Sequence, residues 1–173
     1  KISTLGKLHP SLASTYNNIA NTYSYEKNYT KSLEFHQKSL HIKTRNYGED
    51  HPENARTYGN IARVYTKNKN YDLALEYHQK ALKLKLKSFG KHHPSITGTY
   101  NGIGHVYDAK ENYKKSIEYY KKTLDICIKK LGPNHLYLAK TYGFIGNIYR
   151  KEKNYNLAID TYKKAYNIYN YQL

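Results

Sequence analysis

Histidine is the residue type in this chain with the widest chemistry, because its ring binds metals and exchanges protons near neutral pH. Four of the nine histidines recur every 42 residues: His9, His51, His93 and His135. A further pair, His36 and His78, has the same spacing. Copies one period apart lie too far from each other to share an ion, so we interpret them as turn or capping residues. The His92–His93 doublet lacks the neighbouring cysteines or clustered carboxylates of a zinc site.

Other reactive groups are few. Cys127 is the single cysteine, and it carries no local signature of a nucleophile. The chain has no His-Glu-x-x-His, no phosphate-binding Gly-rich loop and no Gly-x-Ser-x-Gly elbow. The sequence therefore predicts no enzyme, no metal site and no cofactor.

The histidine spacing belongs to a longer internal repeat. Residues 5–46, 47–88, 89–130 and 131–172 align as four 42-residue repeats without a gap. A fixed period in this range is typical of an array of supersecondary units. Residues 1–4 match the end of such a repeat, so we expect them to be the stub of a preceding helix. We also expect the array to continue in a longer parent chain.

Each repeat predicts two helices joined by a short turn. In the first, Tyr16, Ile19, Ala20 and Tyr23 share one face of a helix, and a second helical pattern runs from Tyr29 to Arg45. The turn holds an asparagine that can accept from free N–H groups of the second helix: Asn28, Asn70, Asn112 or Asn154. A glycine follows the second helix and is expected to end it in a left-handed conformation: Gly6, Gly48, Gly90 or Gly132.

These residues resemble a known family. The first repeat contains Leu5-Gly6, His9-Pro10, Ala13, Asn17-Asn18-Ile19-Ala20, Tyr23, Tyr29 and Leu40, and the second contains Ala55, Asn60-Ile61-Ala62, Tyr65, Tyr71, Ala74 and Ala81-Leu82. This pattern is similar to the tetratricopeptide repeat, in the longer form found in kinesin light chains. The resemblance implies an all-α, right-handed solenoid of four helix-turn-helix repeats, forming a single domain over residues 1–173. It departs from the shorter form in having Tyr16 and its equivalents in place of the usual tryptophan.

The face of each first helix opposite its core stripe is expected to line the concave surface of such an array. Its candidate peptide-binding residues are polar or basic: Asn17, Asn18, Asn21, Arg56, Asn60, Arg63, Lys67, Asn101, His105, Lys140 and Asn147. Asparagine amides can both donate to and accept from a peptide backbone. By resemblance to kinesin light chains, Asn17, Asn18, Asn60 and Asn101 match asparagines of the family's groove.

The formal charge of +16 indicates an acidic partner, although a Lys-, Asn- and Tyr-rich composition bias gives the same charge. We therefore predict a non-catalytic scaffold that binds an extended, acidic peptide in its concave groove. Nucleic-acid binding through the basic surface is the main alternative. It is disfavoured because the lysines are spread over both helices and the turns instead of forming one stripe. A purely structural arm of a larger protein is a third hypothesis.

Location, chain ends and glycines give the remaining expectations. A single cysteine and the lack of any stretch of ~20 apolar residues favour a cytoplasmic protein without membrane contact. The last helix ends in Tyr166, Ile168, Tyr169 and Tyr171 without a polar cap, which predicts end-to-end self-association.

Gly104 and Gly146 replace Ala20 and Ala62 and indicate close helix contact. Gly98 and Gly102 have no such reason and should weaken the first helix of the third repeat.

Overall fold

The computed structural model describes residues 9–171, and within this range it forms eight α-helices and one 3-10 turn. They are α1 (Pro10–Tyr25), α2 (Tyr29–Tyr47), α3 (Pro52–Lys67), α4 (Tyr71–Phe89), η1 (Pro94–Ile96), α5 (Thr97–Ala109), α6 (Tyr113–Leu131), α7 (Leu136–Lys151) and α8 (Tyr155–Tyr171). The all-α fold of four helix-turn-helix repeats is confirmed. The expected stub at residues 1–4 lies outside the described residues, as does Gly6.

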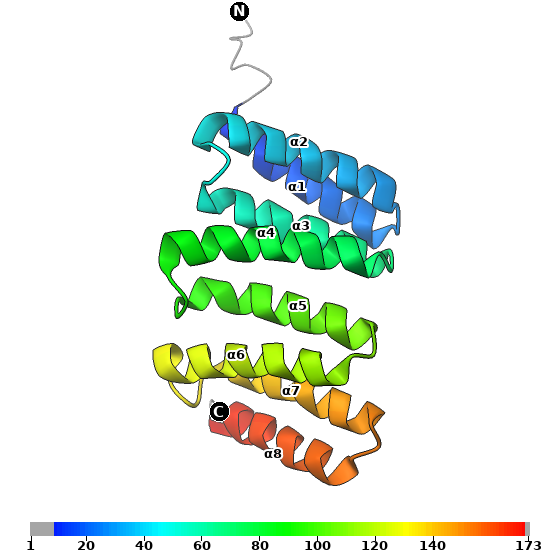
Figure 1. Ribbon diagram of the computed structural model, residues 1–173, viewed down its shortest axis with the longest axis vertical. Helices are drawn as coiled ribbons and strands as arrows, with labels where there is room; N and C mark the ends of the chain where they lie inside the picture. The colour runs from blue at the N-terminus through cyan, green and yellow to red at the C-terminus, as the bar shows by residue number, and fades with distance from the viewer. Residues whose placement is uncertain (1–8, 172–173) are drawn as a thin grey trace, which may run out of the picture. The chain divides into compact units, whose positions relative to one another are not determined.

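The chain divides into two compact units, residues 1–88 and residues 89–173. The first contains the hairpins α1–α2 and α3–α4, and the second contains α5–α6 and α7–α8. In each hairpin the two helices lie side by side and antiparallel (Figure 1). Inside a unit, the second helix of one hairpin packs on the first helix of the next, as α2 does on α3 and α6 on α7.

The recurring histidines begin the first helix of each repeat. The Nδ1 atom of each accepts a hydrogen bond from the backbone N–H two residues later, over 3.3 Å for His9 and 3.2 Å for the other three. This satisfies one of the N–H groups that a helix start leaves unpaired. The rings of His51 and His93 also stack on the preceding Tyr47 and Phe89. The predicted capping role is confirmed.

The turn between the two helices of a repeat is also fixed locally. The side chain of Asn28 accepts from the N–H of Lys31 over 3.2 Å, and Asn112 and Asn154 repeat this contact. The residue before each asparagine has φ between 58° and 61°: Lys27, Lys69, Glu111 and Lys153. Together with the bond from Asn28 N–H to the carbonyl of Tyr23 (2.8 Å), this forms a Schellman ending with a non-glycine residue in the left-handed position.

The second helices end at the glycines, as expected. Gly48 and Gly132 each have φ of 86° with ψ near 160°, a conformation almost confined to glycine. Inside the hairpins, tyrosines of the first helix pack around a ring of the second: Tyr16 and Tyr23 contact Phe35, and Tyr58 and Tyr65 contact Tyr77. This confirms packing as the role of two of the tyrosine columns and adds an aromatic column on the second helix.

Candidate functional site

The polar faces of α1 and α3 carry most of the predicted site residues of the first unit. Asn18, Arg56, Arg63 and Lys67 are exposed, and Asn21 and Asn60 are partly exposed. Between the two helices lies a hollow of about 210 Å³ lined by Asn21, Ser24, Tyr25, Asn60, Arg63, Val64 and Lys67. The lining thus contains two cations, two amides and one exposed aromatic ring, but no carboxylate.

Neutral groups hold both cations of the hollow. Nη2 of Arg63 donates to Oδ1 of Asn60 over 2.8 Å, one turn earlier on α3. Nζ of Lys67 donates to Oγ of Ser24 on α1 over 3.3 Å and lies 4.8 Å from the centre of the Tyr25 ring. A hydroxyl and an aromatic face orient an ammonium group without neutralising it. The hollow therefore presents net positive charge and amide groups to a ligand.

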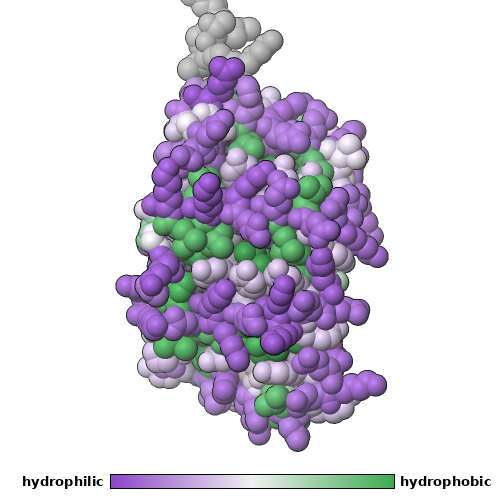
Figure 2. All heavy atoms as spheres, viewed as in Figure 1, coloured by the Kyte–Doolittle hydropathy of each residue, from purple (hydrophilic) through white to green (hydrophobic). Residues whose placement is uncertain are grey.

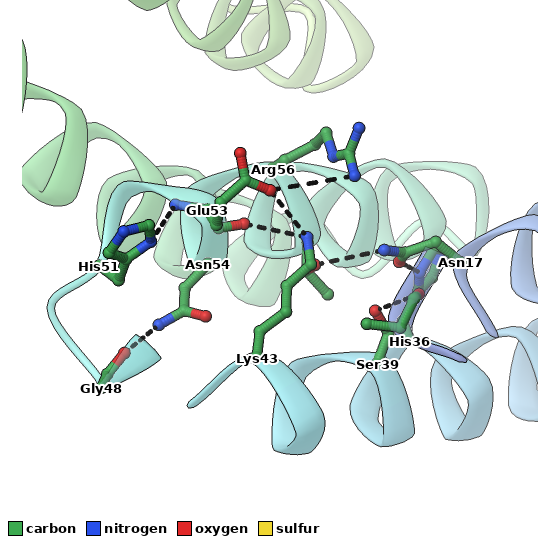
Figure 3. A network of polar contacts seen from close by, with 11 residues as sticks. Asn17, His36, Ser39, Lys43, Gly48, His51, Glu53, Asn54 and Arg56 are labelled. Carbon is green, nitrogen blue, oxygen red and sulfur yellow. Dashed lines mark hydrogen bonds and ion pairs between the residues drawn. The ribbon is translucent and has the colours of Figure 1, made fainter. Parts of the chain in front are cut away.

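Asn17 does not lie open in the groove, contrary to expectation. It is 5% exposed and joins three helices: its Oδ1 accepts from Nδ1 of His36 on α2 over 2.8 Å, and its Nδ2 points to Oγ1 of Thr57 on α3 at 3.5 Å. Figure 3 shows Asn17 beside His36. Burial lowers the pKa of His36 to about 4, with Arg63 and Lys43 adding to the effect, so the ring is neutral at pH 7. Asn17 thus links α1 to α2 and α3.

Lys43 fixes the same junction further along α2. Its side chain is buried, and Nζ donates to the backbone carbonyl of Glu53 over 3.1 Å and lies 3.5 Å from the Glu53 carboxylate (Figure 3). Burial lowers the pKa of Lys43. Arg56 lies 4.0 Å from the same carboxylate, so its charge is only loosely paired.

The second unit has a different surface at the equivalent positions. His105 is an exposed residue, yet its ring packs edge-on against Phe144 of α7, with the two ring centres 4.4 Å apart. A hydrogen bond of 2.9 Å joins Nδ1 of His105 to the hydroxyl of Tyr120. This partial burial lowers the pKa of His105. Asn101 is buried, and its Oδ1 has no hydrogen-bond partner within residues 9–171. The predicted backbone-binding role therefore does not fit Asn101.

The cation of the second unit is paired. Lys151, the equivalent of Lys67, lies 2.7 Å from the carboxylate of Asp108, which stands where the first unit has Ser24. Asn147 replaces Arg63 and accepts from the hydroxyl of Tyr162 over 2.7 Å, while Lys140 is exposed. Four of the predicted residues therefore line the cationic hollow of the first unit: Asn21, Asn60, Arg63 and Lys67. Ser24 and Val64 were missed, because a lone serine or valine in a helix gives no sequence signal.

A larger hollow of about 630 Å³ lies in the second unit, but its lining contains the carboxylates Glu118 and Asp125 beside Lys91, Lys121 and Lys122. Across residues 9–171 no three His, Cys, Asp or Glu side chains are grouped as metal ligands. None of the helices in that range combines the length and apolarity needed to cross a bilayer. On the face shown in Figure 2 hydrophilic side chains predominate, with apolar ones in small patches between them.

Antiparallel helix pairs that repeat every 42 residues and expose a polar first-helix face define a helical-repeat interaction scaffold. The chain belongs to the tetratricopeptide repeat family, whose model matches residues 11–87, 54–121 and 95–170. No curated protein sequence is recognisably similar to it.

Solved structures give the same fold. BtubC (BKLC) from P. vanneervenii superposes with a TM-score of 0.79 at 20% identity, covering 94% of this chain and 65% of that one. The chain therefore spans about two thirds of that protein. A kinesin light chain candidate from Podosopora anserina with nearly identical TPR-like repeats has a TM-score of 0.73 at 19% identity, covering 95% and 78%. The apo form of RapI has a TM-score of 0.74 at 25% identity, covering 95% and 44%. The tetratricopeptide repeat expected from the sequence is confirmed, and the solved structures with the same fold include the kinesin light chain candidate.

Proposed function

We propose that this chain is a non-catalytic scaffold that binds an extended acidic peptide, and that the hollow between α1 and α3 holds an acidic side chain of that peptide. The observation that carries the proposal is the charge of the lining, with Arg63 and Lys67 present and no carboxylate. An anionic ligand would balance the positive charge of this lining.

Comparison between the two units supports this choice. In the second unit Asp108 already occupies the place of an acidic ligand, 2.7 Å from Lys151. In the first unit Ser24 leaves Lys67 with only a neutral hydroxyl and a ring as partners. The equivalent lysine is therefore neutralised by a carboxylate of the chain itself in the second unit, whereas in the first unit it can pair with a carboxylate of a ligand.

The remaining polar residues fit a peptide backbone. Asn21 and Asn60 line the hollow, and Asn18 is exposed on the same helix as Asn21. Arg56 adds exposed positive charge in the first unit and Lys140 in the second. Exposed ion pairs contribute about 0.2–1 kcal/mol each, so affinity should be modest, roughly micromolar, and should weaken with salt. Backbone contacts from asparagine are largely independent of sequence, so charge should determine peptide preference.

The experiment compares two labelled peptides of equal length, one rich in Glu and Asp and one with Gln and Asn at the same places. Fluorescence anisotropy with the whole chain should show binding of the acidic peptide only. Ser24→Asp should abolish most of that binding by pairing Lys67 internally, and Lys67→Gln should weaken it. Lys163→Gln removes the same charge at an exposed position of α8, outside the hollow, and should leave binding unchanged.

Two outcomes would overturn the proposal. One is that neither peptide binds, and the other is that Ser24→Asp binds as tightly as the wild type. A labelled DNA or RNA oligomer in the same assay tests the nucleic-acid alternative, which requires steep salt dependence without sensitivity to Ser24→Asp. We further propose a cytoplasmic location and end-to-end self-association.

A further inference from the structure

The polar groups of the hollow between α1 and α3 are arranged mainly as hydrogen-bond donors. Oδ1 of Asn60 already accepts from Arg63, and Oγ of Ser24 already accepts from Lys67. An arginine side chain presents five N–H groups and a lysine three, and neither accepts a hydrogen bond. Most of these donors remain open to a ligand, so the ligand that matches them carries several acceptor oxygens.

Ser24 adds a buried neutral donor on the α1 side of the hollow. The residue is only 7% exposed, and its hydroxyl proton has no acceptor within residues 9–171. The Nδ2 group of Asn60 also has no acceptor in the described part of the chain. A buried donor without an acceptor costs free energy, and an oxygen supplied by a ligand removes that cost. The lining therefore offers a ligand neutral donors as well as charged ones.

The charge of the lining distinguishes a phosphate group from a carboxylate. Arg63 and Lys67 contribute one positive charge each, and no carboxylate is among the lining residues. A carboxylate balances one of these charges, whereas a phosphorylated side chain carries about −1.5 to −2 at pH 7 and has three acceptor oxygens. A phosphate group therefore matches both the charge and the number of donors better than Glu or Asp does.

Both cations are needed because of where the hollow lies. Ser24 and Lys67 belong to the last turns of α1 and α3, where the helix dipole disfavours an anion. Arg63 lies one turn earlier on α3, and its bond of 2.8 Å to Asn60 fixes one end of the guanidinium group. The remaining N–H groups of an arginine held in this way can bind a phosphate through two parallel hydrogen bonds.

The size of the hollow suits the head group of a single side chain. Its volume of about 210 Å³ is below the roughly 300–1,000 Å³ of sites that enclose a whole small molecule. The exposed amide of Asn18 lies on α1 with the hollow residue Asn21, so a peptide backbone that carries the phosphate has polar partners close by. A phosphorylated peptide therefore fits better than a free nucleotide.

The donor set is specific to the first unit. Two repeats later the residues in place of Asn21, Ser24, Asn60, Arg63 and Lys67 are His105, Asp108, Phe144, Asn147 and Lys151, respectively. Lys151 is the one lysine or arginine among these five, and it pairs with Asp108 at 2.7 Å. The excess positive charge and the free donors of the first hollow are therefore not a general consequence of the repeat.

We propose that the hollow between α1 and α3 binds a phosphorylated side chain of the peptide partner. This inference rests on the proposed peptide-binding function and specifies the acidic group that enters the hollow. Arg63 and Lys67 bind the phosphoryl oxygens, and the Ser24 hydroxyl and the Asn60 amide donate to them as well. Phosphorylation of the partner strengthens binding, because the unmodified hydroxyl brings no charge to the two cations.

Three labelled peptides test the proposal by fluorescence anisotropy with the whole chain. They share the sequence of the acidic peptide used above and differ only at one central position, which holds phosphoserine, glutamate or serine. The phosphoserine peptide should bind at least about tenfold more tightly than the glutamate peptide, and the serine peptide should bind most weakly. Inorganic phosphate should compete only at far higher concentration, since it makes no contacts outside the hollow.

Two variants separate the charged from the neutral contribution. Arg63→Gln should remove most of the preference for phosphoserine over glutamate, because only one cation remains. Ser24→Ala keeps both cations and removes one donor, so it should weaken binding of the phosphoserine peptide by about tenfold and affect the glutamate peptide less. Arg45→Gln removes a guanidinium group from an exposed position of α2, outside the hollow, and should change neither affinity.

The outcomes separate this inference from the function on which it rests. Equal affinity for the phosphoserine and glutamate peptides overturns the phosphate site and leaves the acidic-peptide function standing. No binding of any of the three peptides overturns both. A preference for phosphoserine that persists unchanged in Arg63→Gln also overturns the site, because the phosphate would then be bound elsewhere. So does inorganic phosphate that competes as well as the phosphoserine peptide itself, which would show that the hollow binds free phosphate.

Discussion

Gly104 lies directly against the ring of Tyr120: a Cβ atom added to Gly104 would be 2.6 Å from Cε1 of that ring. Gly146 and Tyr162 repeat this relationship one repeat later, also at 2.6 Å. In the first two repeats the same pair of positions holds Ala20 with His36 and Ala62 with His78. The ring on the second helix and the small residue on the first are therefore matched in size. The hydroxyl of each tyrosine then reaches a polar partner on the first helix, His105 or Asn147.

We expect Gly104→Ala to destabilise the protein. Overpacking a core costs about 1–3 kcal/mol, which outweighs the ~1 kcal/mol that Ala gains over Gly inside a helix. Adding Tyr120→His should remove most of this cost, because the double variant recreates the Ala–His pair of the first repeat. Urea unfolding of the two single variants and the double variant measures this coupling, and additive effects would contradict the size match.

A neighbouring glycine provides the control. No heavy atom lies within 4 Å of a Cβ added to Gly143, one turn before Gly146 on the same helix. Gly143→Ala should therefore stabilise the protein by up to ~1 kcal/mol, while Gly146→Ala should destabilise it. The same substitution should thus have opposite signs three residues apart, and equal signs would show that helix propensity alone determines the effect.

The fold could be read from the sequence because its signals are local. Helix faces, histidine and asparagine caps and the glycine endings each depend on residues within one turn of one another, and four copies repeat every signal. The left-handed residue at Lys27 gave no such signal, since a glycine or asparagine is the usual occupant of that position.

The site could be predicted less completely, because it depends on contacts between hairpins. A helical projection places Asn17 with Asn18 and Asn21, but the adjacent hairpin covers Asn17 and leaves Asn18 exposed. Asn101 of the second unit is buried as well. Lys151 pairs with a carboxylate 43 positions earlier, and nothing in the local pattern distinguishes it from Lys67, which meets the Ser24 hydroxyl at the same separation.

Stability should fall in mild acid because of His36. Its pKa is lowered to about 4 in the folded chain from 6.5, so the unfolded state binds the proton more tightly. The contribution of the neutral ring is therefore fully present above pH 6.5 and is lost as the pH falls from 6.5 to 4. The difference corresponds to about 3 kcal/mol. Urea unfolding between pH 7.5 and pH 4 measures it.

His36→Gln supplies the reference, because glutamine keeps a donor for Asn17 but does not titrate. The variant should be less stable than the wild type at pH 7.5, and the gap between the two should narrow towards pH 4. A gap that stays constant over this range would mean that His36 is not the group responsible. Burial also lowers the pKa of His105. Because both proteins contain His105, its contribution to the pH dependence cancels in this comparison.

The third repeat should have the least stable first helix. Gly98 and Gly102 weaken it, and its first turn is the 3-10 segment Pro94–Ile96, whereas α1 and α3 begin as α-helices at Pro10 and Pro52. Native-state hydrogen exchange should show weaker protection for residues 97–108 than for residues 57–66. Gly102→Ala should raise that protection by up to ~1 kcal/mol. Equal protection of the two segments in the wild type would refute this expectation.

Removing the internal carboxylate of the second unit should create a second place for an acidic ligand. Asp108→Ser leaves Lys151 facing a hydroxyl, as Lys67 faces Ser24 in the first unit. A partly exposed ion pair contributes about 0.2–1 kcal/mol, so stability should fall only slightly and affinity for an acidic peptide should rise by at most about fivefold. The gain should disappear at high salt and in the Asp108→Ser/Lys151→Gln double variant. An unchanged affinity would mean that a free lysine is not sufficient, and that Arg63, which Asn147 replaces in the second unit, is the decisive cation of the hollow.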